Sequence, residues 1–250
     1  MKKFVFFAVA LAALCFAPKA HAAITFDASS TAKQVGFSAG PRTASSSFTV
    51  GSANPNPVLI MCANIFQDTG GVGAVSAATY NGVALTKFAT STRSTNMSAE
   101  CWDLINPPTG SHKASTTVTG ATDDIQVWWA VFDGVNQTTP ITATGTFTGA
   151  GTTSSVSITP SAATDFIVDT ISRFGTNALN FGTGQTSIAS TTGTSAKQGG
   201  SYEAATSTSA VKMTWNWTTA NDSEQIAFNL VAAAAAVAPK QFNRCITMDW

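Results

Sequence analysis

Two tryptophans in this sequence, Trp128 and Trp102, have the character of sugar-binding residues. The apolar faces of sugar rings stack on exposed aromatic side chains, while nearby amides and hydroxyls bind the sugar hydroxyl groups. In the run Ile125–Phe132, side chains alternate between the two faces of a strand, so Trp128 shares its face with Gln126. That face is mixed, whereas the opposite face is apolar and should point inward. The pattern names Trp128, Trp102 and Gln126 as candidate ligand-binding residues.

The mixed face of Trp128 has two interpretations. It could be the open concave surface of a β-sandwich, where glycans often lie, or it could be covered by a long loop. Trp102 has polar and apolar neighbours on its own face and is equally ambiguous. By contrast, one face of the run Val211–Trp217 is apolar, which predicts that Trp215 and Trp217 are core residues.

The sequence contains little evidence for a combination of residues that could perform catalysis. After the N-terminal segment the sequence has a single histidine, His112, in a polar turn, and no Gly-x-Ser-x-Gly motif accompanies it. A glycosidase needs two carboxylates across a cleft, and the local pairs are Asp123 with Asp124 and Asp165 with Asp169. The first pair lies in a turn, where aspartates commonly bind backbone. We therefore expect no enzyme activity, with a glycan-active hydrolase as the least favoured alternative.

Metal-ligand spacing is also lacking. One histidine and three scattered cysteines do not have the paired spacing of a zinc site. Calcium occurs in many β-sandwiches, but no Asp-x-Asp-x-Asp-Gly loop supports it here. We expect no cofactor and name no metal ligand, with calcium as an alternative that no motif supports.

The first 22 residues predict export. Lys2 and Lys3 form a positive region, Phe4–Ala17 is apolar but too short to span a bilayer, and Ala20–Ala22 offers the small residues that signal peptidase requires. Residues 1–22 are thus interpreted as a signal peptide, with a mature chain from Ala23. The mature protein is expected outside the cell or at its surface, with the periplasm as an alternative.

The cysteines add information about this compartment. Cys15 would mark a lipoprotein only after a small residue, and Leu14 precedes it. Cys62 and Cys101 both lie in strand-like runs and could form a disulfide, worth about 4 kcal/mol in the chain-entropy model. Two buried free thiols are the alternative. Cys245 is left over and could join two chains or have no role.

Charge and length limit the partners. Removal of the signal peptide takes away three lysines and leaves ten basic against thirteen acidic residues. A weakly acidic chain rich in Thr, Ser, Ala and Gly is not expected to bind nucleic acid. We expect no transmembrane segment in the mature chain, whose length suits one large all-β domain with its own core.

Short alternating runs bounded by turn residues recur through residues 23–238, and helical periodicity is nearly absent. They predict one all-β domain, a two-sheet antiparallel β-sandwich of jelly-roll type, followed by a flexible tail at residues 239–250. Asn81-Gly82 predicts a type I′ hairpin turn between adjacent strands. The predicted strands are Ile24–Asp27, Ser45–Val50, Val58–Ile65, Val75–Tyr80, Val83–Phe88, Met97–Ile105, Lys113–Val118, Ile125–Phe132, Thr142–Thr148, Ser154–Thr159, Asp165–Ser172, Ser195–Glu203, Ala210–Trp217 and Glu224–Ala232.

Three turn segments carry a family resemblance. Tyr80–Thr86 with its Asn-Gly turn, Trp102–Gly110 with its Asn-Pro-Pro-Thr-Gly turn, and Phe132–Pro140 follow one another in this order. Together they resemble a jelly-roll-like β-sandwich module that recurs in secreted bacterial and phage-associated proteins, over roughly Ser45–Val231. The resemblance implies the sandwich fold and no shared activity.

We therefore expect a secreted, non-catalytic β-sandwich protein that binds extracellular or cell-surface carbohydrate. The alternative is a self-assembling structural subunit of a surface fibre or virion. The chain has few charged residues that could protect its strand edges against pairing with other chains. In addition, the run Ala23–Asp27 could donate a strand to a neighbour.

Overall fold

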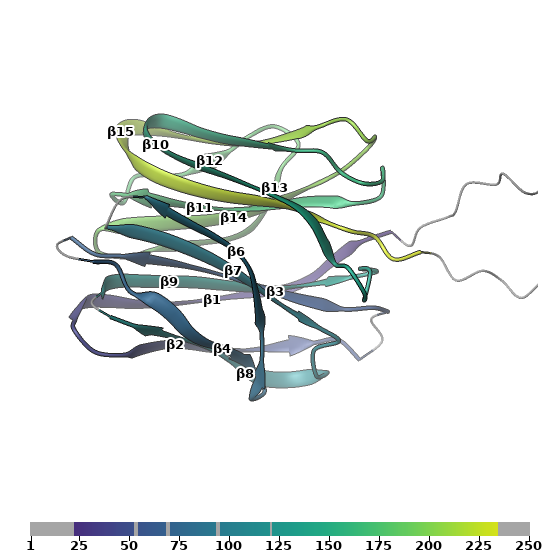
Figure 1. Cartoon of the computed structure of the whole chain (residues 1–250), viewed down its shortest axis with the longest axis horizontal. Helices are drawn as coiled ribbons and strands as arrows, with labels where there is room; N and C mark the ends of the chain where they lie inside the picture. Colours follow the sequence, from purple (N-terminus) through teal and green to yellow (C-terminus); the bar gives the residue numbers. More distant parts are fainter. Residues whose placement is uncertain (1–22, 53–54, 69–70, 94–95, 121, 235–250) are drawn as a thin grey trace, which may run out of the picture. The chain divides into compact units, whose positions relative to one another are not determined.

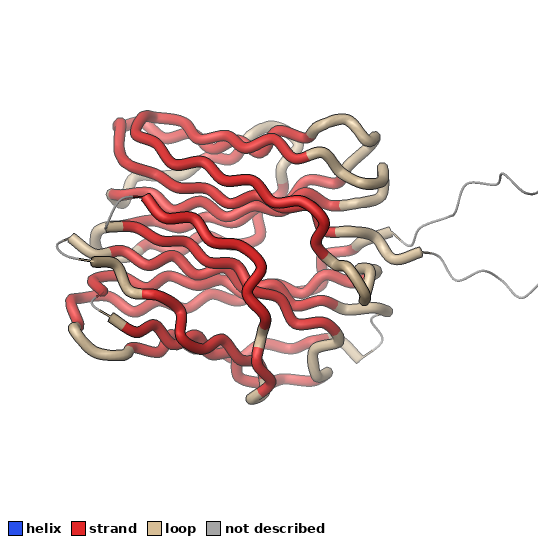
Figure 2. Tube along the Cα trace, in the orientation of Figure 1, coloured by secondary structure: helices blue, strands red, loops and turns tan. Residues whose placement is uncertain are grey.

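The computed structural model describes residues 23–52, 55–68, 71–93, 96–120 and 122–234 (Figure 1). The predicted signal peptide and the predicted C-terminal tail lie outside the described residues. The described part of the chain consists of antiparallel strands, turns and loops without a helix (Figure 2), which confirms the all-β fold class. It therefore contains no helix that could span a membrane.

The strands belong to three sheets, where the sequence pattern predicted two. We call them the central sheet, the small sheet and the long-strand sheet. The central sheet has the order β1 (Thr25–Ser38), β9 (Thr122–Asp133), β3 (Val58–Phe66), β7 (Met97–Ile105) and β6 (Thr86–Arg93). The small sheet has the order β2 (Arg42–Val50), β8 (Gly110–Thr119), β4 (Ala74–Tyr80) and β5 (Val83–Ala84). The long-strand sheet has the order β10 (Ile141–Ile158), β15 (Val211–Leu230), β11 (Phe166–Phe174), β14 (Ala196–Ala204) and β13 (Thr186–Thr192), with β12 (Asn180–Phe181) paired to β15.

The central sheet is buried on both faces. One face packs against the small sheet through residues such as Leu59 and Trp129, and the other packs against the long-strand sheet through Ile60 and Trp128. Figure 1 shows the three layers, with the central sheet between the other two. Strands buried on both faces have continuous apolar runs, and every residue of Val58–Phe66 is buried. A continuous apolar run therefore indicates a strand of the middle layer. Alternation of apolar and polar side chains alone does not distinguish a middle layer from an outer one.

The antiparallel pair of β10 and β15, which are separated in the chain by β11 to β14, folds back over the outer face of its own sheet. Its register shifts between Gly151 and Thr153, and the part beyond this point places Val156, Ile158 and Met213 in a core with the β11 residue Ile167. The sequence pattern predicted β10 and β15 as two strands each, because the polar bend separates two alternating runs. The bend lies within one long pair of strands.

Local turn chemistry agrees with the sequence. Asn81 and Gly82 have φ angles of 50° and 77°, and they join Tyr80 to Val83 in a tight antiparallel hairpin, as predicted. The N-terminal run that could have been donated to a neighbour instead pairs within its own chain, since β1 runs antiparallel to β9 from Thr25 onward.

Candidate functional site

The structure does not bring the two predicted stacking tryptophans together. Trp128 pairs with Cys62 of β3, and Trp102 pairs with the adjacent residue, Met61. Consecutive residues of a strand point to opposite faces, so Trp128 faces the long-strand sheet and Trp102 faces the side of the small sheet. The two candidate stacking rings therefore do not share one surface.

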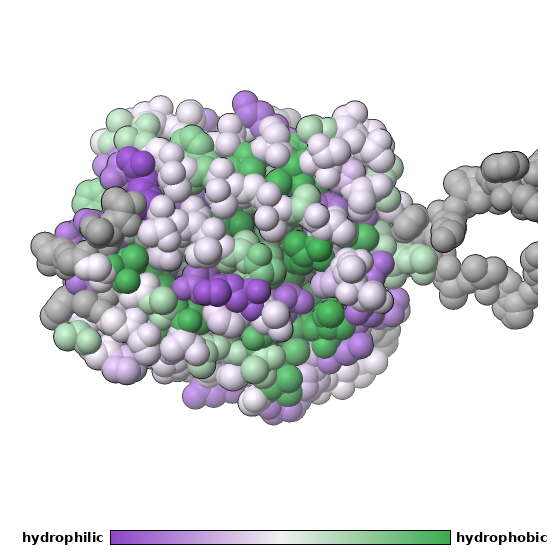
Figure 3. All heavy atoms as spheres, in the orientation of Figure 1, coloured by the Kyte–Doolittle hydropathy of each residue, from purple (hydrophilic) through white to green (hydrophobic). Residues whose placement is uncertain are grey.

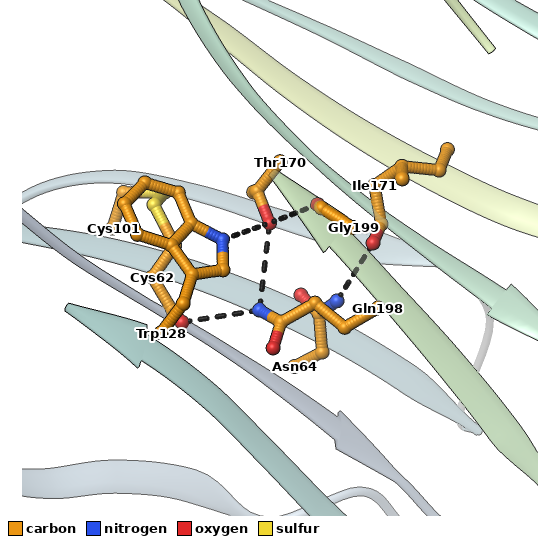
Figure 4. Close-up of a disulfide and its surroundings, with 8 residues drawn as sticks. All are labelled: Cys62, Asn64, Cys101, Trp128, Thr170, Ile171, Gln198 and Gly199. Carbon is orange, nitrogen blue, oxygen red and sulfur yellow. Dashed lines mark hydrogen bonds between the residues drawn. A yellow bond between two sulfur atoms is a disulfide. The ribbon is translucent and has the colours of Figure 1, made fainter. Parts of the chain in front are cut away.

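Trp128 is a core residue that is only 1% exposed. Its indole Nε1 donates a hydrogen bond to Thr170 Oγ1 at 3.1 Å, and its ring lies beside the Cys62–Cys101 disulfide (Figure 4). Gln126 is also buried, and its Nε2 donates to the carbonyl oxygen of Ala196 at 2.8 Å. The mixed face of β9 is thus covered, by a whole sheet and not by a loop, and it offers no surface to a ligand.

Cys62 and Cys101 form a disulfide. The two residues are directly opposite in the pairing of β3 with β7, and their Cα atoms are 4.2 Å apart. The sequence left open either a disulfide or two buried free thiols, and the structure contains the disulfide. Cys245 lies outside the described residues.

Trp102 is half-buried and lies at the margin of the core between the central and small sheets. The Lys87 Nζ is 5.5 Å from the centre of its ring and 3.1 Å from Glu100 Oε2. Glu100 Oε1 in turn accepts a hydrogen bond from the backbone N–H of Val75. A lysine that is held by a buried carboxylate lies over the ring, so Trp102 does not present an open stacking face.

The carboxylates that a glycosidase would use serve the backbone instead. Asp123 Oδ2 accepts from the Asp68 N–H at 2.6 Å, and Asp124 Oδ2 accepts from the N–H groups of Ser195 and Ala196. These bonds fix loops between strands. His112 Nε2 likewise bonds the carbonyl oxygen of Thr109 within its own turn, and the imidazole is half-buried against Tyr80.

Asp165 and Asp169 lie in separate networks. Asp165 caps a turn by accepting from the Ser161 and Ala162 N–H groups. Burial acts to raise its pKa, but hydrogen bonds from the Ala232 N–H, the Ser161 hydroxyl, the Asn229 amide and the Ala162 N–H lower the pKa overall. Asp169 is fully buried and contacts Trp215 in the folded-back part of β15. Burial raises its pKa to about 6, although Ser201, Trp215 and Gln225 each donate to it at 2.6 Å. Neither carboxyl faces a cleft.

Among the residues that the structure describes, no three His, Cys, Asp or Glu side chains come close enough together to hold a metal ion. The calcium alternative therefore gains no support from the described side chains.

A pocket lies elsewhere, where strands of the central and long-strand sheets end together. It has a volume of about 150 Å³ and is lined by Phe66, Asp68, Asn96, Met97, Phe174 and Asp222. Three of these residues mark strand ends, because β3 ends at Phe66, β7 begins at Met97 and β11 ends at Phe174. Residues from distant parts of the chain thus meet at one end of the layers.

The pocket has an aromatic floor and wall. The rings of Phe66 and Phe174 are 5.3 Å apart and tilted by 32° to each other. Phe66 is buried together with Met97 and Ala196, whereas Phe174 is 39% exposed. Phe174 therefore contacts the buried ring of Phe66 and leaves part of its own side chain exposed at the pocket.

The polar side of the pocket is also held in place. Asn96 Nδ2 donates to the backbone carbonyl of Asp68 at 3.2 Å, and Asp222 Oδ1 accepts from Arg93 Nη2 at 2.8 Å. Glu224, two residues along β15 from Asp222, is buried, and burial raises its pKa well above its usual range. Arg93 opposes this shift only in part. The pocket is lined by the carboxyl groups of Asp68 and Asp222, and Arg93 forms an ion pair with Asp222.

No protein-family model, curated protein or solved structure matches this chain. The functional argument therefore depends on the pocket itself. Sequence reasoning missed Phe66, Phe174 and Asp222 because it weighed only tryptophans as stacking residues. One signal for Phe174 was present, namely an aromatic residue at a strand end directly before a turn glycine, Gly175.

Proposed function

We propose that this protein binds extracellular or cell-surface carbohydrate, and that the pocket at Phe174 takes a single sugar ring. The observation that carries the proposal is the exposed face of Phe174 beside two carboxylates and an amide. Stacking of an apolar sugar face on an aromatic ring, with planar polar groups at the edge for the hydroxyls, is the usual chemistry of such sites.

The size of the pocket limits the ligand. Pockets that enclose drug-sized molecules have volumes of roughly 300 to 1,000 Å³, and this one has about 150 Å³. It suits one ring at the end of a glycan chain better than an internal stretch of polysaccharide. The carboxylate of Asp68 favours neutral sugars over acidic ones, because it would repel a uronate or sialate, whereas the charge of Asp222 is paired with Arg93.

The sequence supports this function through its export signal, since a secreted protein meets glycans outside the cell. The proposal retains carbohydrate as the ligand, but moves the site from Trp128 and Trp102 to Phe174. It requires no catalysis, because the aspartates weighed as glycosidase pairs are engaged with backbone or core groups.

Saturation-transfer NMR on the full chain with glucose, galactose, mannose and N-acetylglucosamine tests the proposal. The Phe174→Ala variant should lose the signal of any sugar that binds the unmodified protein. Phe181→Ala is a matched control, because Phe181 is 41% exposed in the same sheet but lies outside the pocket. The proposal fails if no sugar binds, or if both variants retain binding equally.

A further inference from the structure

Among the described residues, strand β10 forms an edge of the long-strand sheet. It stands at the end of the sheet order, and every ladder pair that it makes with described residues is with β15. An edge strand carries a row of backbone N–H and C=O groups without a ladder partner, which is a template for another strand. β10 is 18 residues long, longer than the usual 3 to 10 residues of strands in globular proteins.

Between Ala143 and Gly151, where its pairing with β15 is regular, this edge lacks the devices that normally prevent pairing with other chains. The segment Ile141–Ile158 contains no charged residue and no proline, although lysine and proline are common protections of edge strands. At the opposite end of the same sheet, β13 is only 7 residues long and its register is shifted. Edge strand β6 of the central sheet carries Lys87 and Arg93 and also has a register shift. β10 is therefore the least protected of these edges.

The exposed side chains of β10 form a regular row of threonines, Thr142, Thr144, Thr146 and Thr148. Threonine pairs across antiparallel strands stabilise a sheet through contacts and hydrogen bonds. A neutral row of this kind neither repels a second copy of itself nor requires a complementary charge.

The sequence of β10 is nearly symmetric about Phe147. Reading outward in both directions gives Thr146 with Thr148, Gly145 with Gly149, and small residues up to Thr142 with Thr152. In an antiparallel pair of identical strands centred on one residue, each residue faces its mirror position in the other copy, so such an interface is isologous. Equal or similar residues would then face each other along the regular stretch from Ala143 to Gly151.

We propose that two copies of this chain associate by antiparallel pairing of their β10 strands, centred on Phe147. The pairing joins the two long-strand sheets into one continuous sheet across a two-fold axis. Thr146 of each copy then faces Thr148 of the other. The partner at this edge is a second copy of the chain, because the nearly symmetric β10 sequence is complementary to a second β10 strand. The pairing needs no other described segment. The inference stands independently of the sugar site.

Sedimentation velocity over a range of concentrations tests the association, using the full chain with Cys15→Ser and Cys245→Ser to exclude chance disulfides. The variant T146K/T148K creates two facing pairs of lysines across the interface. Because like charges that face each other destabilise strand pairing, this variant should be monomeric. The variant T146E/T148K places glutamate opposite lysine and should dimerise again. Both sites are exposed, and equal melting temperatures would show that the fold is unchanged. A monomeric starting protein, or a T146K/T148K variant that remains dimeric, overturns the proposal.

Cysteine pairs test the register. In the background with both Cys15→Ser and Cys245→Ser, a mixture of T146C with T148C chains should form a disulfide-linked dimer under mild oxidation, whereas each variant alone should form little. The directly opposed Cys62 and Cys101 of this protein show that facing positions of antiparallel strands are within bonding reach. Equal cross-linking in the mixture and in the separate variants would contradict pairing centred on Phe147.

Discussion

Trp128 and Trp129 are consecutive in β9, yet their side chains lie in two different hydrophobic cores. Trp129 is buried between the central and small sheets, and Trp128 is buried between the central and long-strand sheets. One dipeptide therefore stabilises both interfaces of a three-layered arrangement. This follows from the alternation of side chains in a strand that is covered on both faces.

Replacement of either tryptophan by alanine should destabilise the whole domain. Truncation of a fully buried tryptophan costs about 3 to 5 kcal/mol, so W128A and W129A should each lower the free energy of unfolding by that amount. Urea unfolding measured by circular dichroism would show this. The half-buried Trp102 is the control, since W102A should cost clearly less. A W128A protein with unchanged stability would mean that the long-strand sheet does not cover β9.

Trp128 shows which features of the fold and of the candidate site could be predicted from the sequence. Alternation separated the two faces of β9 correctly, and Asn81-Gly82 located a hairpin, because both signals are local. What covers a face depends on which distant strands pack there, and no local pattern contains that information. The pocket at Phe174 and Asp222 was missed for the same reason, since its walls come from strand ends far apart in the chain.

Gly200 in β14 should tolerate no larger side chain. A Cβ atom at this position would lie 2.8 Å from Trp128 Nε1, and one at Gly199 would lie 2.6 Å from the Trp215 ring on the opposite face. Overpacking of this kind typically costs about 1 to 3 kcal/mol. G200A should therefore lower the melting temperature, whereas G40A, where a Cβ has nothing within 4 Å, should leave it unchanged. Thermal unfolding of the two variants decides between these outcomes.

The Cys62–Cys101 disulfide should contribute to stability without being required for the fold. It closes a loop with a sequence separation of 39, for which the chain-entropy model gives about 4 kcal/mol. Both cysteines are fully buried, so the C62A/C101A variant keeps an apolar pair at this site. It should unfold at lower urea concentration with the same native circular dichroism spectrum. Loss of that spectrum in the absence of denaturant would contradict the expectation.

Stability should fall as the pH rises from about 4 to about 6. Burial raises the pKa of Asp169 and of Asp103 from the usual 3.8 to about 6. Between these values the folded chain binds more protons than the unfolded chain, so the stabilisation is complete below about pH 4 and is lost as the pH passes 6. At 1.36 kcal/mol for each pKa unit, the buried Asp169 accounts for up to about 3 kcal/mol.

The variant Asp103→Asn separates this effect from general acid stability. Its neutral amide should reduce the decrease in unfolding free energy between pH 4 and pH 6, measured by urea denaturation at both values. Asp165→Asn is the control, because hydrogen bonds lower the pKa of Asp165 and its contribution is lost only as the pH falls below about 4. That variant should keep the decrease between pH 4 and pH 6. An identical pH profile in Asp103→Asn and the unmodified protein would show that Asp103 titrates normally, because a buried carboxyl that stays protonated until pH 6 must contribute to the slope.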